Sequence, residues 1–116
     1  ISRMHFHTTL YQTMYEHNDK QYIRVKLDET ATLAVARTHE KKRHYLRSSN
    51  IENPLTGNIL TLKVPFRYRR VMCQVTGGTP VQALKPGDAL EIDAEFTPWN
   101  AGDHSGFSWK CIKIST

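Results

Sequence analysis

The sequence predicts a small all-β protein, and three observations favour this class. Apolar and polar residues alternate along most of the hydrophobic segments, which is the period of a half-buried strand. The stretches between these segments are rich in Gly, Pro, Asn and Asp, which favour turns. The chain has 116 residues, of which 39% are hydrophobic and 23% charged, enough for one compact core but not for two. We therefore expect about five strands in a small barrel or sandwich.

Two segments in the first half of the chain alternate. Residues 21–27 place every second apolar side chain on one face, and residues 30–37 continue the alternation at Leu33 and Val35. Both segments are predicted strands.

The N-terminal stretch, residues 5–17, fits the period of a helix as well as that of a strand, but its threonines and tyrosines favour a strand. Residues 1–3 precede Met4 and are interpreted as an expression scar or a trimmed end. The predicted domain is then residues 4–116.

Residues 39–58 are predicted to form a long basic loop. Serine, asparagine, proline and glycine recur in this segment, and they interrupt any regular periodicity. A loop of this length in a compact domain is usually functional or disordered.

The clearest strand is predicted over residues 59–75. Its apolar side chains keep one parity as far as Tyr68, and the parity changes after the pair Arg69-Arg70. A one-residue change of register is typical of a β-bulge, which bends a strand as a barrel requires. On this parity, Phe66 and Tyr68 are expected to lie in the core rather than to stack on a ligand.

The last third of the chain predicts two more strands, residues 89–96 and residues 107–114, separated by a loop over residues 97–106. Trp109 alternates with apolar neighbours and is expected in the core. Cys73 and Cys111 are expected to be buried, reduced thiols, because both lie in apolar segments and two cysteines do not form a disulfide framework.

Two segments of this last third resemble an oligonucleotide/oligosaccharide-binding (OB) fold of the single-stranded-DNA-binding kind. In Leu84–Ile92 a Gly-Asp turn leads into an alternating strand, which is similar to the opening of the fourth barrel strand in such proteins. A polar loop followed by Gly106–Ile114 is similar to their fifth strand. The resemblance implies a small five-stranded OB-like β-barrel that carries the long basic loop.

The sequence departs from that pattern in two places. The usual helix between the third and fourth strands would have to fit between Gly77 and Asp88, which leaves about one turn, as in small viral or phage members. The basic loop after Arg37 is longer than a minimal member needs, and we expect it to grip the ligand.

Positive charge is concentrated in the N-terminal two-thirds. Residues 1–80 hold 13 basic and six acidic side chains, whereas residues 81–116 hold three basic and five acidic ones. Single strands are bound by cations that hold phosphates and by aromatic rings that stack on bases. The candidate nucleic-acid-binding residues are Tyr22, Arg24 and Lys26 on the polar face of residues 21–27; Lys41, Lys42, Arg43, Tyr45 and Arg47 in the basic loop; Arg67, Arg69 and Arg70 on the bent strand; and Trp99 in the loop 97–106.

Simpler interpretations of these residues remain open. A basic run can be a solvated surface, and Trp99 needs either a protein cover or a ligand. Glu91, Asp93 and Glu95 share one strand face and could bind a cation or act as an acid/base pair, but a solvated face or a surface for a basic neighbouring subunit is favoured.

Catalytic and metal-binding patterns are not found in the sequence. His5 and His7 could share a strand face, but the six histidines have no spacing typical of zinc ligands, and we expect no metal and no cofactor. The sequence lacks Gly-x-Ser-x-Gly and a phosphate-binding glycine loop, so an enzyme is not expected.

The leading hypothesis is a sequence-independent binder of single-stranded nucleic acid. The resemblance implies that the ligand is DNA and that the protein acts in replication or recombination inside a cell or host. A homo-oligomer is compatible with this hypothesis, and the absence of a long apolar run predicts no membrane partner. The rival is a β-rich structural or interaction module, such as a virion or assembly subunit, whose basic loop contacts an acidic partner.

Overall fold

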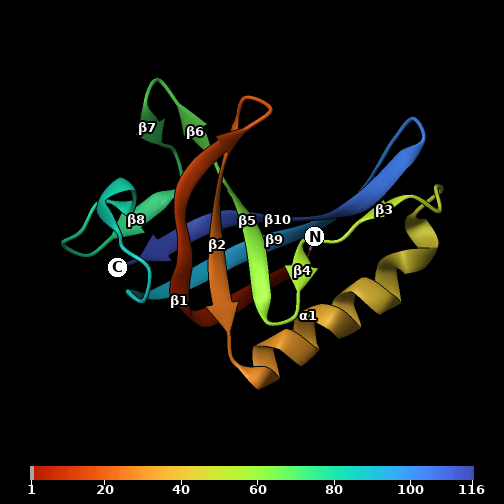
Figure 1. Cartoon of the computed structure of the whole chain (residues 1–116), viewed down its shortest axis with the longest axis horizontal. Coiled ribbons are helices and arrows are strands. Elements are labelled where there is room, and N and C mark those ends of the chain that lie inside the picture. Colours follow the sequence, from red (N-terminus) through yellow and green to blue (C-terminus); the bar gives the residue numbers. More distant parts are fainter. Residues whose placement is uncertain (1) are drawn as a thin grey trace.

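The computed structural model describes residues 2–116, and its centre is a closed barrel of five strands (Figure 1). In chain order the elements are β1 (Ser2–His17), β2 (Lys20–Leu27), α1 (Glu29–Lys42), the 3-10 turn η1 (Arg43–Tyr45), β3 (Ile51–Glu52), β4 (Leu55–Thr56), β5 (Ile59–Val64), β6 (Phe66–Arg67), β7 (Arg70–Val71), β8 (Gln74–Thr76), the 3-10 turn η2 (Val81–Ala83), β9 (Ala89–Ala101) and β10 (His104–Ser115).

The barrel strands follow the order β1, β2, β5, β10 and β9, and β9 pairs again with β1. Neighbouring barrel strands are antiparallel except β5 and β10, which run parallel where Lys63 meets Lys110. This pairing closes the barrel, and the predicted five-stranded architecture is confirmed.

Side chains from alternate positions of the five strands fill the barrel. Ile23, Val25, Leu62 and Ile92 are completely buried, and Trp109, predicted in the core, is 1% exposed. The period of two was therefore a reliable guide to which face of each barrel strand points inward.

The N-terminal stretch is a strand, as its composition favoured. It joins β2 through a tight turn at Asn18 and Asp19, both with left-handed backbone angles (φ 51° and 64°), a conformation that asparagine and aspartate tolerate. The predicted scar begins at Ile1, outside the described residues, while Ser2 and Arg3 pair with β9 at Phe96 and Glu95.

The predicted strand over residues 30–37 is wrong, because these residues belong to α1. Asp28 caps the helix, since its Oδ1 accepts a hydrogen bond of 2.7 Å from the Ala31 N–H. Val35 and His39, four residues apart, are the buried side chains of the helix, whereas Leu33 is 49% exposed. The alternation of Leu33 with Val35 therefore did not indicate a strand.

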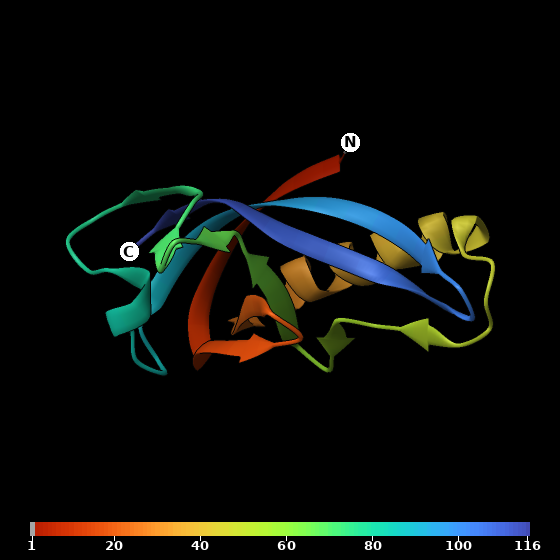
Figure 2. The ribbon, with the colours of Figure 1, turned by 90° about the horizontal axis from the view of Figure 1, so that it is seen from above.

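The predicted long basic loop is also partly helical. Its first residues complete α1 and η1, and short strands β3 and β4 interrupt the remainder. Figure 1 shows α1 running from the end of β2 towards the outer end of the long β9–β10 ribbon. Figure 2 shows the same helix and ribbon side by side from above.

His39 attaches α1 to this ribbon. Its imidazole is 6% exposed and lies parallel to the Phe107 ring, with centroids 4.2 Å apart. The indole N–H of Trp109 donates a hydrogen bond of 3.0 Å to His39 Nε2. Burial lowers the pKa of His39 to about 4, so the imidazole is neutral near pH 7.

The predicted bent strand over residues 59–75 is wrong beyond Val64. A small hairpin of β6 and β7 follows, and its turn residues Tyr68 and Arg69 have left-handed angles (φ 55° and 61°). The parity of the apolar residues changes because the chain passes through this turn, and not because of a bulge. Tyr68 lies at the tip and is 83% exposed, so its predicted core position is wrong, and Phe66 is half-buried.

The predicted loop over residues 97–106 is mostly strand. β9 continues to Ala101 and β10 begins at His104, so the two strands form a ribbon that extends beyond the barrel. Proline and glycine in this segment suggested a loop, but Gly102 (φ 61°) lies in the turn itself.

Between β8 and β9 the only regular element is the three-residue turn η2, which agrees with the lack of space for a helix there. Both cysteines are free; Cys111 is buried as expected, whereas Cys73 is only half-buried. No helix within residues 2–116 is both long and apolar enough to cross a membrane.

Candidate nucleic-acid interface

A groove of about 790 Å³ crosses the outside of the barrel. One side comes from the β1–β2 hairpin, the floor from β2 and β5, and the other side from the β9–β10 ribbon, with the segment around β3 at one end. Its lining residues are Tyr15, His17, Asn18, Lys20, Tyr22, Glu52, Asn53, Pro54, Thr61, Lys63, Glu95, Thr97, Trp99, Ala101, Phe107, Ser108, Trp109 and Lys110.

Aromatic side chains from both sides line this groove. Tyr22 stacks on Tyr15 of the neighbouring strand, with ring centroids 5.8 Å apart and planes 29° from parallel. Burial, with smaller contributions from Tyr15 and Glu52, raises the pKa of Tyr22, so its phenol stays protonated near neutral pH. Trp99 projects from the ribbon into the same groove. The structure thus brings together two predicted site residues, Tyr22 and Trp99.

Three lysines in the groove were missed by sequence reasoning. Lys63 on β5 is opposite Lys110 on β10, and Lys20 at the start of β2 is close enough for its charge to act on Lys63. Burial first, and then the charges of Lys20 and Lys110, lower the pKa of Lys63. None of the ion pairs within residues 2–116 involves these lysines. An anion bound here would relieve the repulsion between them.

Trp99 lies against Gly106, its register partner on β10. A methyl group on Gly106 would lie 2.7 Å from Cζ2 of Trp99 and 2.8 Å from the carbonyl oxygen of Glu52. Only glycine at this position therefore leaves room for both the Trp99 indole and the β3 backbone to lie against β10.

Replacing Gly106 by alanine is expected to displace Trp99 or β3 and to lower the free energy of unfolding by about 1–3 kcal/mol, the usual cost of overpacking. Urea denaturation and Trp99 fluorescence, with the Trp99→Phe protein as the reference for Trp109, measure the two effects. Gly78→Ala is the matched control, because a methyl group there meets no atom within 4 Å. Equal stability and emission in the Gly106 and Gly78 variants would contradict the tight fit.

The three candidate residues on the polar face of β2 lie in different surroundings. Tyr22 lines the groove, but Arg24 donates a hydrogen bond of 3.3 Å to Gln12 Oε1 and lies over the Tyr11 ring. Lys26 lines a second hollow, of about 690 Å³, at the other end of β2. The three side chains share a strand face, as predicted, but only Tyr22 lines the groove.

The helix-end cluster, which comprises Lys41, Lys42, Arg43, Tyr45 and Arg47, lies outside the groove lining. The ammonium group of Lys42 is 5.4 Å from the centroid of the Tyr45 ring. Asn100 holds this segment against the ribbon, since its side chain accepts from the Arg47 N–H (2.8 Å) and donates to the Tyr45 carbonyl (3.1 Å). Adjacent strand residues point to opposite faces, so the cluster contacts the ribbon opposite Trp99.

The other predicted cations form an arginine hairpin, made of Arg67, Arg69 and Arg70 around the exposed Tyr68. All four side chains are exposed and none lines the groove. An exposed tyrosine between arginines offers a stacking surface beside phosphate-binding groups.

The acidic face of β9 is partnered within the chain. Glu91 is 2.9 Å from His7 Nδ1, Asp93 is 2.5 Å from His5 Nδ1, and Glu95 is 4.0 Å from Arg3 Nε. These three pairs are rungs between β1 and β9. Each of the three carboxylates therefore has a side-chain partner on β1 within this chain.

The sequence matches no protein-family model and no curated protein. Among solved structures, the fold is similar to that of gp2.5, a single-stranded DNA binding protein encoded by bacteriophage T7. The TM-score is 0.52 at 11% sequence identity, and the match covers 99% of this chain and 91% of that chain. This likeness concerns the fold, and it agrees with the all-β OB-like architecture that the sequence predicted.

Proposed function

We propose that this protein binds single-stranded nucleic acid, with DNA as the expected ligand, in the groove between the β1–β2 hairpin and the β9–β10 ribbon. The observation that carries the proposal is the combination, in one groove, of aromatic rings on both sides and three lysines that form no ion pair within residues 2–116. OB-fold barrels bind oligonucleotides with one face of the sheet and two of the loops that join its strands. The same face and the corresponding hairpins surround this groove. The similar protein gp2.5 is described as a single-stranded DNA binding protein.

Each group in the groove has a distinct task. Bases stack on Tyr22 and Trp99, and phosphates approach Lys20, Lys63 and Lys110. Stacking on ring faces and attraction to ammonium groups do not distinguish one base from another, so little sequence preference is expected. The arginine hairpin and the helix-end cluster extend the positive surface beyond the groove and supply additional, salt-sensitive phosphate contacts.

Such a binder would cover single strands during replication or recombination inside the cell, and no cofactor is needed for that task. Glu91, Asp93 and Glu95 were the feature that favoured the rival interaction module, and each already has a partner on β1. We therefore place the nucleic-acid hypothesis first.

Fluorescence anisotropy with a labelled single strand, competed by duplex of the same sequence over a range of salt, tests the proposal. For single strands the logarithm of affinity is expected to fall with the logarithm of salt by about 0.7 per neutralised phosphate. Lys63→Ala should lower the affinity and reduce this slope by about 0.7, because it removes one phosphate contact.

Lys85→Ala is the matched control, because Lys85 is exposed and lines neither hollow. Wild-type slope in Lys63→Ala, or duplex that competes as well as single strand, would contradict the proposed groove. Binding to neither ligand, with oligomers that dissociate at high salt in light scattering, would favour the interaction module.

A further inference from the structure

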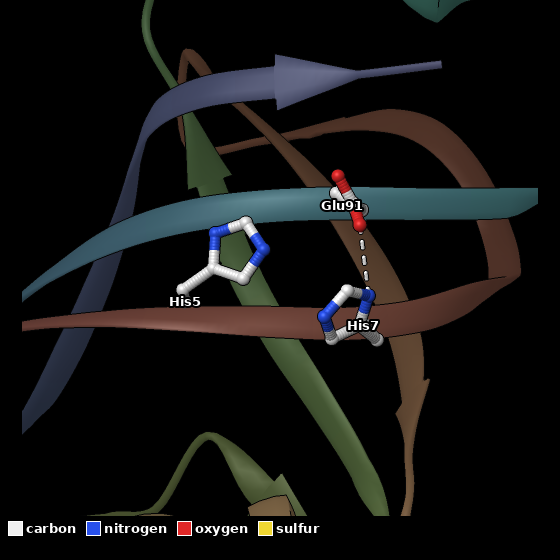
Figure 3. Close-up of side chains that lie close together, drawn as sticks. All are labelled: His5, His7 and Glu91. Atoms are coloured by element: carbon white, nitrogen blue, oxygen red, sulfur yellow. Dashed lines mark ion pairs between the residues drawn. The ribbon is translucent and has the colours of Figure 1, made fainter.

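The outward face of β1 carries two histidines opposite two carboxylates of β9. His5 and His7 are two residues apart and lie on one strand face, and the register places them opposite Asp93 and Glu91. Their rings are edge to face, with centroids 5.1 Å apart. Figure 3 shows both imidazoles on β1 beside Glu91 on β9. His5 and His7 therefore share a strand face, as their spacing in the sequence allowed.

Distances within the group suit a shared ion. Among the described residues, one potential ligand atom from each of His5, His7 and Glu91 lies within 4.8 Å of the other two. His7 Nδ1 and Glu91 Oε1 are 2.9 Å apart. Two donors on one tetrahedral zinc ion, at bonds of 2.0–2.2 Å, are separated by roughly 3.3 Å. All three side chains are exposed and lie on paired strands, so no surrounding packing fixes their donor atoms at the present spacing.

Comparison with the next cross-strand pair shows why the two histidine–carboxylate pairs differ from ordinary ion pairs. Arg3 and Glu95 continue the same ladder, but a guanidinium has no lone pair and cannot bind a metal. An imidazole has two ring nitrogens, and His5 Nδ1 contacts Asp93 Oδ1 at 2.5 Å. When Nδ1–H donates to the carboxylate, the lone pair of Nε2 is directed away from it, which is the usual arrangement of a metal-binding histidine and its supporting carboxylate.

We propose that His5, His7 and Glu91 bind a divalent transition-metal ion, with Asp93 as a positioning residue that orients His5. Two imidazole nitrogens and one carboxylate oxygen suit zinc, and also copper or nickel, better than the harder magnesium or calcium ions. The ion would join β1 to β9 and keep a coordination position for water. None of the four residues lines the groove, so this site is independent of nucleic-acid binding.

Isothermal titration calorimetry of the full chain with zinc chloride tests the proposal. We expect one ion per chain and a melting temperature that rises with zinc, because an ion bound to the folded state stabilises it. His5→Gln and His7→Gln should each lower the affinity at least about ten-fold, and Asp93→Asn roughly 10- to 100-fold, the usual effect of losing a supporting carboxylate. Without metal, these exposed substitutions should leave the melting temperature unchanged within about 2 °C.

His44→Gln is the control, because His44 is also exposed but lies outside the group. The absorption spectrum with cobalt should lack a thiolate charge-transfer band, which excludes binding at Cys73. No heat of binding, unchanged affinity in the His5→Gln/His7→Gln double variant, or an equal loss in His44→Gln would overturn the site. Oligonucleotide affinity should be the same in the double variant, so failure of this site and failure of the groove are separate results.

Discussion

Replacing both Tyr22 and Trp99 by alanine is expected to lower the affinity for a single strand by about thirty-fold or more. Each base stacked on an aromatic side chain contributes about 1–3 kcal/mol, so loss of two stacks removes about 2–6 kcal/mol. The two rings come from opposite sides of the groove, and each is held by the protein itself: Tyr22 by Tyr15, and Trp99 by Gly106. Anisotropy titrations of the single and double variants at one fixed salt concentration measure the effect.

Two control proteins separate stacking from folding. Tyr11→Ala removes a 51% exposed tyrosine that lines neither hollow, and its affinity should equal that of the wild type. Trp99→Phe keeps an aromatic face and should retain most of the affinity that Trp99→Ala loses. Wild-type affinity in a folded double alanine variant would show that the groove is not the binding surface.

The barrel could be predicted because its signal is local. Each barrel strand buries one face, so alternation within a few residues identifies it and selects the inward side chains, as for Ile23 and Val25. The helix α1 was missed because two apolar residues, Leu33 and Val35, mimic the same period. The cap at Asp28 and the i, i+4 pair of Val35 and His39 were the better signals, but a buried histidine does not count as apolar in such a pattern.

Most of the groove could not be predicted, because it is assembled by strand register. Lys63 and Lys110 come from distant parts of the chain, and only the parallel pairing of β5 with β10 brings them together. The high density of basic residues in the sequence instead favoured the helix-end cluster, whose five candidate residues lie close together in the chain but outside the groove lining. Tyr22 and Trp99 were predicted because an aromatic side chain on a polar face or in a polar segment is conspicuous without knowledge of its neighbours.

Strand register also brings His5 and His7 together with the β9 carboxylates. The i, i+2 spacing was visible in the sequence, but the third ligand, Glu91, comes from a strand more than 80 residues later. A search for ligands close together in the chain cannot find such a group, whereas an antiparallel register places it directly.

Acidification is expected to destabilise the protein between about pH 6.5 and pH 4 through His39. Burial lowers the pKa of its imidazole from 6.5 to about 4 in the folded state, whereas the unfolded chain keeps the ordinary value. Within this window the unfolded state binds more protons, so the free energy of unfolding rises with pH. The contribution is fully present above pH 6.5 and is lost as the pH falls towards 4; it amounts to about 3 kcal/mol.

The structural cause of this loss is specific and can be removed by substitution. A protonated Nε2 cannot accept the hydrogen bond from Trp109, and the charge would lie against the Phe107 ring in a buried site. In His39→Gln the amide oxygen can still accept from the indole, so urea denaturation should show a flatter dependence on pH than in the wild type. His44→Gln should keep the wild-type profile, because His44 is exposed. If His39→Gln lost as much stability between pH 6.5 and pH 4 as the wild type, the acid sensitivity would belong to other groups, and the contact between α1 and the ribbon would not depend on a neutral imidazole.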